Sequence, residues 1–135
     1  MTKRLLFLGL ILALVLPPIP VEAQTSQMGA CPFSANSLKA AYTEMLTVST
    51  TALPFTASKY NPGSGAPKAV CATVVVNTNS ISWWPAGTTP TASDGVITDT
   101  GGSFSIGPSN LATFLMIRAE ASDSAVAVIY QVPVN

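Results

Sequence analysis

The sequence predicts an all-β protein, a small antiparallel β-sandwich of jelly-roll or immunoglobulin-like type, with one short N-terminal helix after a signal peptide. From Thr47 onward, short runs rich in Val, Thr, Ile and aromatic residues follow one another, which is typical of strands. Clusters of Gly, Pro, Asn, Asp and Ser separate these runs, as turns do. No helical repeat lies between the runs, so the core is expected to be made of strands, in a sandwich or a small barrel.

Residues 1–23 have the composition of a signal peptide. Lys3 and Arg4 provide a positive start, and residues 5–16 form an uninterrupted apolar run of 12 residues. A membrane-spanning helix needs about 20 apolar residues, so a cleaved signal fits this run better than an anchor. Cleavage is expected after Ala23, which leaves a protein exported to the periplasm or the cell exterior, without a membrane span.

The remaining 112 residues carry little charge. They contain four cationic and five anionic side chains, for a formal net charge of −1. A nucleic-acid-binding protein needs a basic stripe, and attachment to an anionic membrane needs a basic patch. Neither nucleic acid nor a membrane surface is therefore expected as a partner.

Cys31 and Cys71 are the cysteines of the chain. An even number in an exported protein favours a disulfide, which would close a loop across 40 residues and stabilise the fold by about 4 kcal/mol in the chain-entropy treatment. The alternative is that Cys71, within the apolar run 69–76, is a free buried side chain that packs as a small hydrophobe.

Residues 24–46 are predicted to form an N-terminal arm with a short helix at 37–46, ahead of a β-sandwich domain at 47–135. Apolar residues recur at helical spacing in this stretch, and Asn36 or Ser37 could cap the helix. The apolar positions are Leu38, Ala41, Tyr42 and Met45.

Seven strands are predicted after the helix, and residues 69–77 are expected to be the central one because both of their faces are apolar. Turn residues at 77–79, 99–102 and 120–124 are expected to join successive strands into three hairpins. The predicted strands are residues 47–53, 69–77, 80–84, 95–98, 103–106, 112–119 and 125–132.

The chain contains no histidine, so Ser-His-Asp and Cys-His catalysis and most zinc sites do not apply. The acidic side chains Asp94, Asp99, Glu120 and Asp123 fall in or beside turns, where carboxylates usually accept bonds from backbone amides. Arg118 is expected to reach Asp94 or Asp99, or to lie over an aromatic ring. We therefore expect a protein that is not an enzyme, with no catalytic residue, cofactor or metal site.

Trp83 and Trp84 form the conspicuous aromatic pair. Adjacent residues of a strand face opposite sides of a sheet, so one Trp should enter the core and the other should lie at the surface. A surface Trp could stack on a sugar ring or anchor a protein contact. The alternative is ordinary packing at the rim of the core.

Three blocks of sequence, at residues 55–69, 87–95 and 117–130, occur in an order that resembles a family of short β-sandwich proteins of tailed phages and prophages. Phe55-Thr56-Ala57-Ser58-Lys59-Tyr60 opens the first block and Gly87-Thr88-Thr89-Pro90-Thr91 opens the second. The resemblance spans about residues 53–132. Proteins of this family are taken to be virion accessory or structural proteins.

The resemblance implies a non-enzymatic structural or accessory protein that assembles with other proteins or with itself, or displays a surface, on the virion if phage-encoded. The signal peptide favours an alternative: an exported cell-surface or periplasmic module that binds a glycan or a protein through Trp83 or Trp84 and the loop at 85–94.

Overall fold

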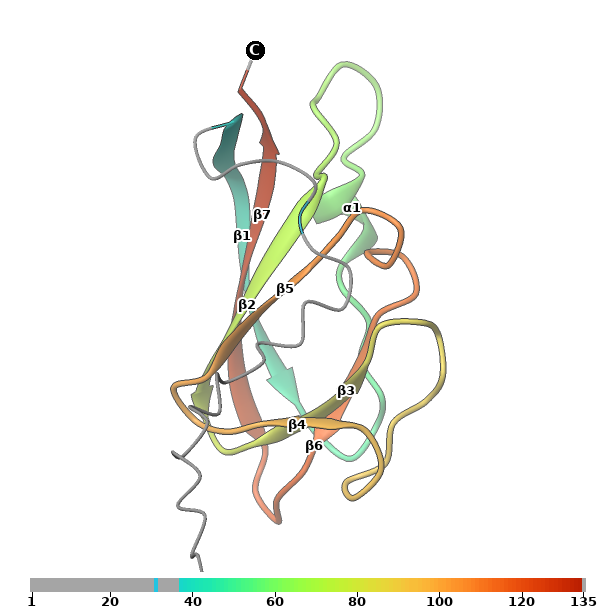
Figure 1. Cartoon of the computed structure of the whole chain (residues 1–135), viewed down its shortest axis with the longest axis vertical. Helices are drawn as coiled ribbons and strands as arrows, with labels where there is room; N and C mark the ends of the chain where they lie inside the picture. The colour runs from blue at the N-terminus through green and yellow to red at the C-terminus, as the bar shows by residue number, and fades with distance from the viewer. Residues whose placement is uncertain (1–30, 32–36, 135) are drawn as a thin grey trace, which may run out of the picture.

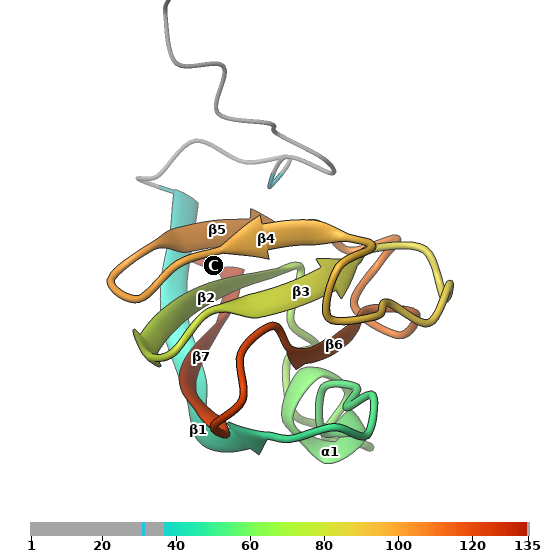
Figure 2. The same cartoon turned by 90° about the horizontal axis from the view of Figure 1, so that it is seen from below.

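Two antiparallel sheets face each other in the computed structural model, which describes Cys31 and residues 37–134 (Figures 1 and 2). Sheet A has the strand order β1-β7-β2-β5, and sheet B has the order β4-β3-β6. The predicted all-β antiparallel sandwich is confirmed, whereas the predicted signal peptide at residues 1–23 lies outside the described residues. The elements are β1 Leu38–Val48, α1 Ala57–Tyr60, β2 Cys71–Thr78, β3 Ile81–Trp84, β4 Val96–Thr98, β5 Ser103–Ile106, β6 Leu115–Arg118 and β7 Ser124–Pro133.

The predicted helix at 37–46 is wrong, because residues 38–46 belong to β1. From Tyr42 to Val48 the strand pairs residue by residue with β7, and alternate side chains face the core. The helical pattern placed Met45 on a buried face, yet Met45 is 65% exposed. Pairing with a distant strand overrides the local helical spacing here. The expected division at residue 46 is also wrong, since it cuts through β1.

The strand expected at 47–53 is reduced to the end of β1 and one isolated bridge. β1 stops at Val48, and Leu53 pairs with Met116 of sheet B, its amide donating to the Met116 carbonyl at 2.8 Å. A helical turn, α1, follows at Ala57–Tyr60. Residues 49–60 therefore carry the chain from the edge of sheet A past the edge of sheet B and back.

The three predicted hairpins are wrong, because at each of these turns the chain passes from one sheet to the other. The turn at 77–79 joins β2 of sheet A to β3 of sheet B, and the turn at 99–102 joins β4 of sheet B to β5 of sheet A. The turn at 120–124 joins β6 of sheet B to β7 of sheet A. The turn at 99–102 forms, with the Gly102 amide donating to the Asp99 carbonyl at 2.8 Å. Gly101 and Gly102 then bond Val76 of β2. The turn residues thus reverse the chain without pairing its two flanking strands.

β2 is an interior strand, as predicted, with β7 and β5 as its neighbours. Its two faces differ, however: Val74 and Val76 are fully buried, whereas Thr73 and Val75 on the other face are half-buried. The apolar run therefore provides one face that packs in the core and one outer face on which Thr73 and Val75 are half-buried.

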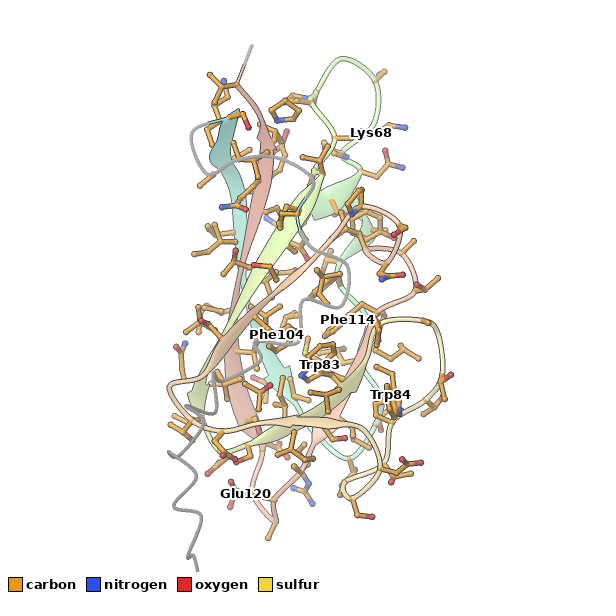
Figure 3. The ribbon with its side chains drawn as sticks, in the orientation of Figure 1. Lys68, Trp83, Trp84, Phe104, Phe114 and Glu120 are labelled. Atoms are coloured by element: carbon orange, nitrogen blue, oxygen red, sulfur yellow. A yellow bond between two sulfur atoms is a disulfide. The ribbon has the colours of Figure 1, made fainter. Side chains whose placement is uncertain are left out.

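Aromatic rings fill the centre of the sandwich. Trp83 stacks on Phe104 with ring centroids 4.1 Å apart (Figure 3). Phe55 stacks on Phe114 with ring centroids 4.3 Å apart. Trp83 is 3% exposed, and its Nε1 donates to Thr98 Oγ1 at 2.9 Å. The expectation that one Trp of the pair enters the core is confirmed for Trp83.

Removal of the Trp83 ring should destabilise the fold strongly. Trp83→Ala is expected to lower the free energy of unfolding by about 4 kcal/mol, because it leaves a large cavity against Phe104. The half-buried neighbour provides the matched control, since Trp84→Ala should cost less than about half as much. Guanidinium unfolding of the oxidised protein measures both values, and equal losses would contradict this account of the core.

Candidate functional site

The outer face of sheet A is uncharged across all four strands. The outer face carries the residues of β7 and β2 that alternate along each strand with the buried residues. It also carries the residues of β1 and β5 that pair with them. The residues are Leu38, Ala40, Thr43, Met45, Thr47, Cys71, Thr73, Val75, Ser103, Ser105, Ala125, Ala127, Ile129, Gln131 and Pro133. Small hydroxyl, amide and apolar side chains thus form an uncharged surface, which we call the neutral face; at Cys71, which is fully buried, it is covered.

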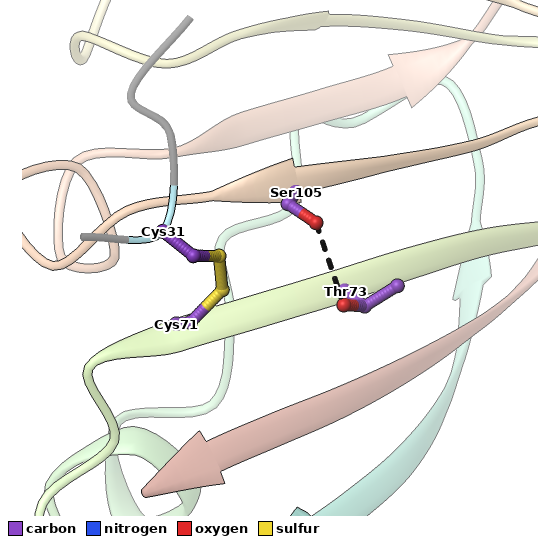
Figure 4. Close-up of a disulfide and its surroundings, with 4 residues drawn as sticks. All are labelled: Cys31, Cys71, Thr73 and Ser105. Atoms are coloured by element: carbon purple, nitrogen blue, oxygen red, sulfur yellow. Dashed lines mark hydrogen bonds between the residues drawn. A yellow bond between two sulfur atoms is a disulfide. The ribbon is translucent and has the colours of Figure 1, made fainter. Parts of the chain in front are cut away.

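A disulfide joins Cys31 to Cys71 on the neutral face, with Cα atoms 5.4 Å apart (Figure 4). Cys71 pairs with Gln131 of β7 and is fully buried. Beside it, the hydroxyls of Thr73 and Ser105 lie 3.5 Å apart. The predicted disulfide is confirmed, and it attaches the segment that precedes β1 to an interior strand.

Two of the predicted turn carboxylates meet at one serine. Ser80, which connects the two sheets between β2 and β3, has its Oγ 2.6 Å from Glu120 Oε1 and 2.9 Å from Asp99 Oδ1. The Ser80 amide also donates to Glu120 Oε1 at 2.9 Å. These bonds stabilise the carboxylate and lower the pKa of Glu120 below its usual range. Both carboxylates therefore hold the chain where it passes between the sheets.

The other two turn carboxylates, Asp123 and Asp94, have other partners than Ser80. Asp123 receives a bond from Arg118 at 2.9 Å, and its backbone carbonyl accepts from Asn79 Nδ2 at 2.7 Å. The expectation that Arg118 reaches Asp94 or Asp99 is wrong, because Asp123 is its partner. Asp94 lies in a turn in which the Thr91 amide donates to its carbonyl at 3.0 Å.

A carboxylate outside the predicted turns, that of Glu44, faces the core. Glu44 lies on the same inward side of β1 as Tyr42 and Leu46, and it accepts hydrogen bonds from the Tyr130 hydroxyl and, at 3.3 Å, from the Thr56 amide. Burial and the Glu44 bond raise the pKa of Tyr130 well above its usual range. The period-two pattern of residues around Glu44 was the sequence signal for a strand with Glu44 on its inward side. The helix predicted at 37–46 was chosen in its place.

The two tryptophans have different environments. Trp83 is buried, so a surface-binding role for Trp83 is wrong. Trp84 is half-buried and pairs with Leu115 of β6 on the outer face of sheet B (Figure 3). Ile97, which is 47% exposed, and Ile117 pair with Ser82 on this same face. A surface contact by Trp84 stays a prediction.

No protein-family model matches the sequence, and no curated protein matches it. Among solved structures, a chain of the Bacillus endospore appendages, which are described as a novel family of disulfide-linked pili, is similar with 15% identity. The similarity covers 73% of this chain and 90% of that chain, with a TM-score of 0.40. A likeness of this strength carries no inference about function.

Two further findings concern the described part of the chain. No helix among residues 37–134 is long and apolar enough to cross a membrane. In the same residues and Cys31, no group of three or more Cys, Asp or Glu side chains is arranged to hold a metal ion.

Loss of the disulfide should destabilise the protein. The Cys31→Ala/Cys71→Ala variant is expected to lose about 4 kcal/mol, because the bond restricts a 40-residue loop in the unfolded chain. Chemical unfolding of the variant, the oxidised protein and the reduced protein measures the difference. The reduced protein should resemble the variant, and a variant as stable as the oxidised protein would refute the expected role of the bond.

Glu120 should add an acid-sensitive contribution to stability. Its folded pKa is lowered, so the contribution is complete above the ordinary value of about 4.3 and is lost as the pH falls through the folded pKa. Glu120→Gln should therefore lose less stability than the wild type between neutral pH and pH of about 3. Titration by carboxyl-carbon NMR checks the cause, because Ser80→Ala should raise the pKa of Glu120. An unchanged pKa would contradict the role of Ser80.

Proposed function

We propose that this protein is a non-enzymatic structural or accessory component of an extracellular particle, of the tailed-phage type, and that it binds other proteins through the neutral face. The neutral face is the single observation that carries the proposal. The charged side chains lie elsewhere: Lys39 and Glu44 of β1 pair with residues on the buried face of β7, and Arg118 lies in sheet B. Asp99, Glu120 and Asp123 lie in the connections between strands. The centres of protein interfaces are depleted in charged residues, whereas free surfaces usually mix both signs.

The side-chain chemistry of the neutral face suits an extended contact. Thr43, Thr47 and Ser103 are exposed hydroxyls on the two outer strands, and Met45 adds a flexible apolar side chain. A hydroxyl costs much less to remove from water than a charged group does, and Met adapts to irregular partner surfaces. The face can therefore be covered without leaving a buried charge unpaired.

The Cys31–Cys71 bond supports a location outside the cytoplasm. Disulfides persist in the periplasm, at cell surfaces and on virions, and they are rare in reducing cytosol. In the proposed role, the disulfide keeps the protein folded outside the cell, where an unfolded copy is not replaced.

Mass spectrometry of culture material from the producing organism tests the proposal. The protein is expected to sediment with particles in a fixed ratio to their other components. Ser103→Glu, which places a charge on the neutral face, should reduce its amount in the particle fraction, because the charge would be buried at the contact. The matched control is Ser109→Glu, at an exposed position in the loop after β5.

A protein that stays in the soluble or cell-associated fraction would overturn the particle proposal. That outcome would favour an exported module that binds a glycan or a protein. In such a module Trp84, Leu115 and Ile97 on the outer face of sheet B would provide the contact.

A further inference from the structure

β1 is a long strand with one open edge. It has 11 residues, and Figure 2 shows it at the margin of sheet A with β7 on one side. Among the described residues, the backbone bonds of Leu38–Val48 run to β7 and to no other segment. The strand at the opposite margin, β5, has only four residues. An exposed edge of this length is a template for another strand.

The β-bulge in β1 changes which side chains share a face. The register shifts between Ala40 and Tyr42, so that Lys39 pairs with Val132 and Glu44 pairs with Val128. Both partners belong to the buried face of β7. Lys39 and Glu44 therefore point to the same side of sheet A, although five positions separate them and a regular strand would place them on opposite sides.

We propose that β1 pairs antiparallel with β1 of a second copy, so that the two four-stranded sheets become one continuous sheet across a twofold axis. The axis lies between Ala41 and Tyr42, and Lys39 of each copy is opposite Glu44 of the other. This inference rests on the proposed function and names one partner within the assembly, a second copy of this chain.

The residue pairs on either side of the axis are compatible. Leu38 is opposite Met45 on the neutral face, Ala40 is opposite Thr43 on the neutral face, and the charged pair lies on the other side. Opposite charges and apolar pairs directly across two strands stabilise a sheet. The contact covers Met45, which is 65% exposed in the single chain. Because the dimer is symmetric, each favourable pair occurs twice.

The bulge also selects this register over others. The axis passes beside the extra residue Ala41, which is opposite Tyr42 of the partner strand, and the pairs on either side of the axis then join residues that share a face. An antiparallel register centred on Met45 would leave Glu44 opposite Leu46 and Lys39 without an acidic partner. A parallel pairing would place Lys39 beside Lys39 and Glu44 beside Glu44, which is unfavourable.

Sedimentation equilibrium of the oxidised chain without residues 1–23 tests the pairing. We expect a reversible dimer in the wild type. In Met45→Lys the dissociation constant should rise roughly tenfold or more, because the symmetric interface contains the added charge twice. Ile97→Lys is the matched control, since Ile97 is also an exposed apolar strand residue but lies in sheet B. It should leave the dissociation constant unchanged.

Disulfide trapping tests the register. The Leu38→Cys/Met45→Cys variant should form covalent dimers on mild oxidation, because opposed residues bring their Cβ atoms within reach of a bond. The two new cysteines of one chain cannot join, since seven strand positions separate them by about 23 Å. Met45→Cys alone should stay monomeric on a non-reducing gel. Peptide mapping confirms that Cys31 and Cys71 remain joined.

Three results would overturn the inference: a wild type that stays monomeric at about millimolar concentration, a dimer indifferent to Met45→Lys, or trapping by Met45→Cys alone as fast as by the double variant. None of these three results tests the proposed function, which is tested separately by sedimentation of the protein with particles. A protein that sediments with particles but shows one of these results would assemble through a different contact.

Discussion

The fold depends on the position of β7 between β1 and β2. The last strand of the chain bonds the first strand on one side and a middle strand on the other, and its inward side chains, including Val126, Val128 and Tyr130, form much of the core. β1 has no other backbone partner among the described residues, so it becomes a strand only when the C-terminus is in place. Pairing across such a long stretch of sequence is slow to form and strongly cooperative.

The connections between the sheets depend on polar contacts at one position. The Ser80 carbonyl accepts from the Ala119 amide at 2.9 Å and from Ser124 Oγ at 3.0 Å, while its amide and hydroxyl bond Glu120 and Asp99. Three separate connections thus converge on one residue. The carboxylates satisfy backbone and hydroxyl donors that would otherwise be buried without partners, which explains why acidic residues lie at this end of the sandwich.

The charged and the uncharged parts of the surface have different roles. Charged side chains around Ser80 and Arg118 hold the fold together, whereas the neutral face and the open edge of β1 carry few groups that resist burial. The proposed particle contact and the proposed pairing of two copies use adjoining parts of sheet A. Pairing through β1 would extend the neutral face across both copies, so the two contacts are compatible within one assembly.

The sequence by itself determined the β class and the positions of most strands and favoured a Cys31–Cys71 disulfide, because alternation, turn residues and cysteine number are local or countable signals. It also determined that one of two adjacent tryptophans is buried, since neighbours on a strand face opposite sides. Only the tertiary structure decided that Trp83 is the buried one, that residues 38–48 form a strand, and that the turns lead from one sheet to the other. Those outcomes depend on which distant strand supplies the backbone partners and the core contacts. The energy of that non-local pairing exceeds the small local preference for a helix or a hairpin.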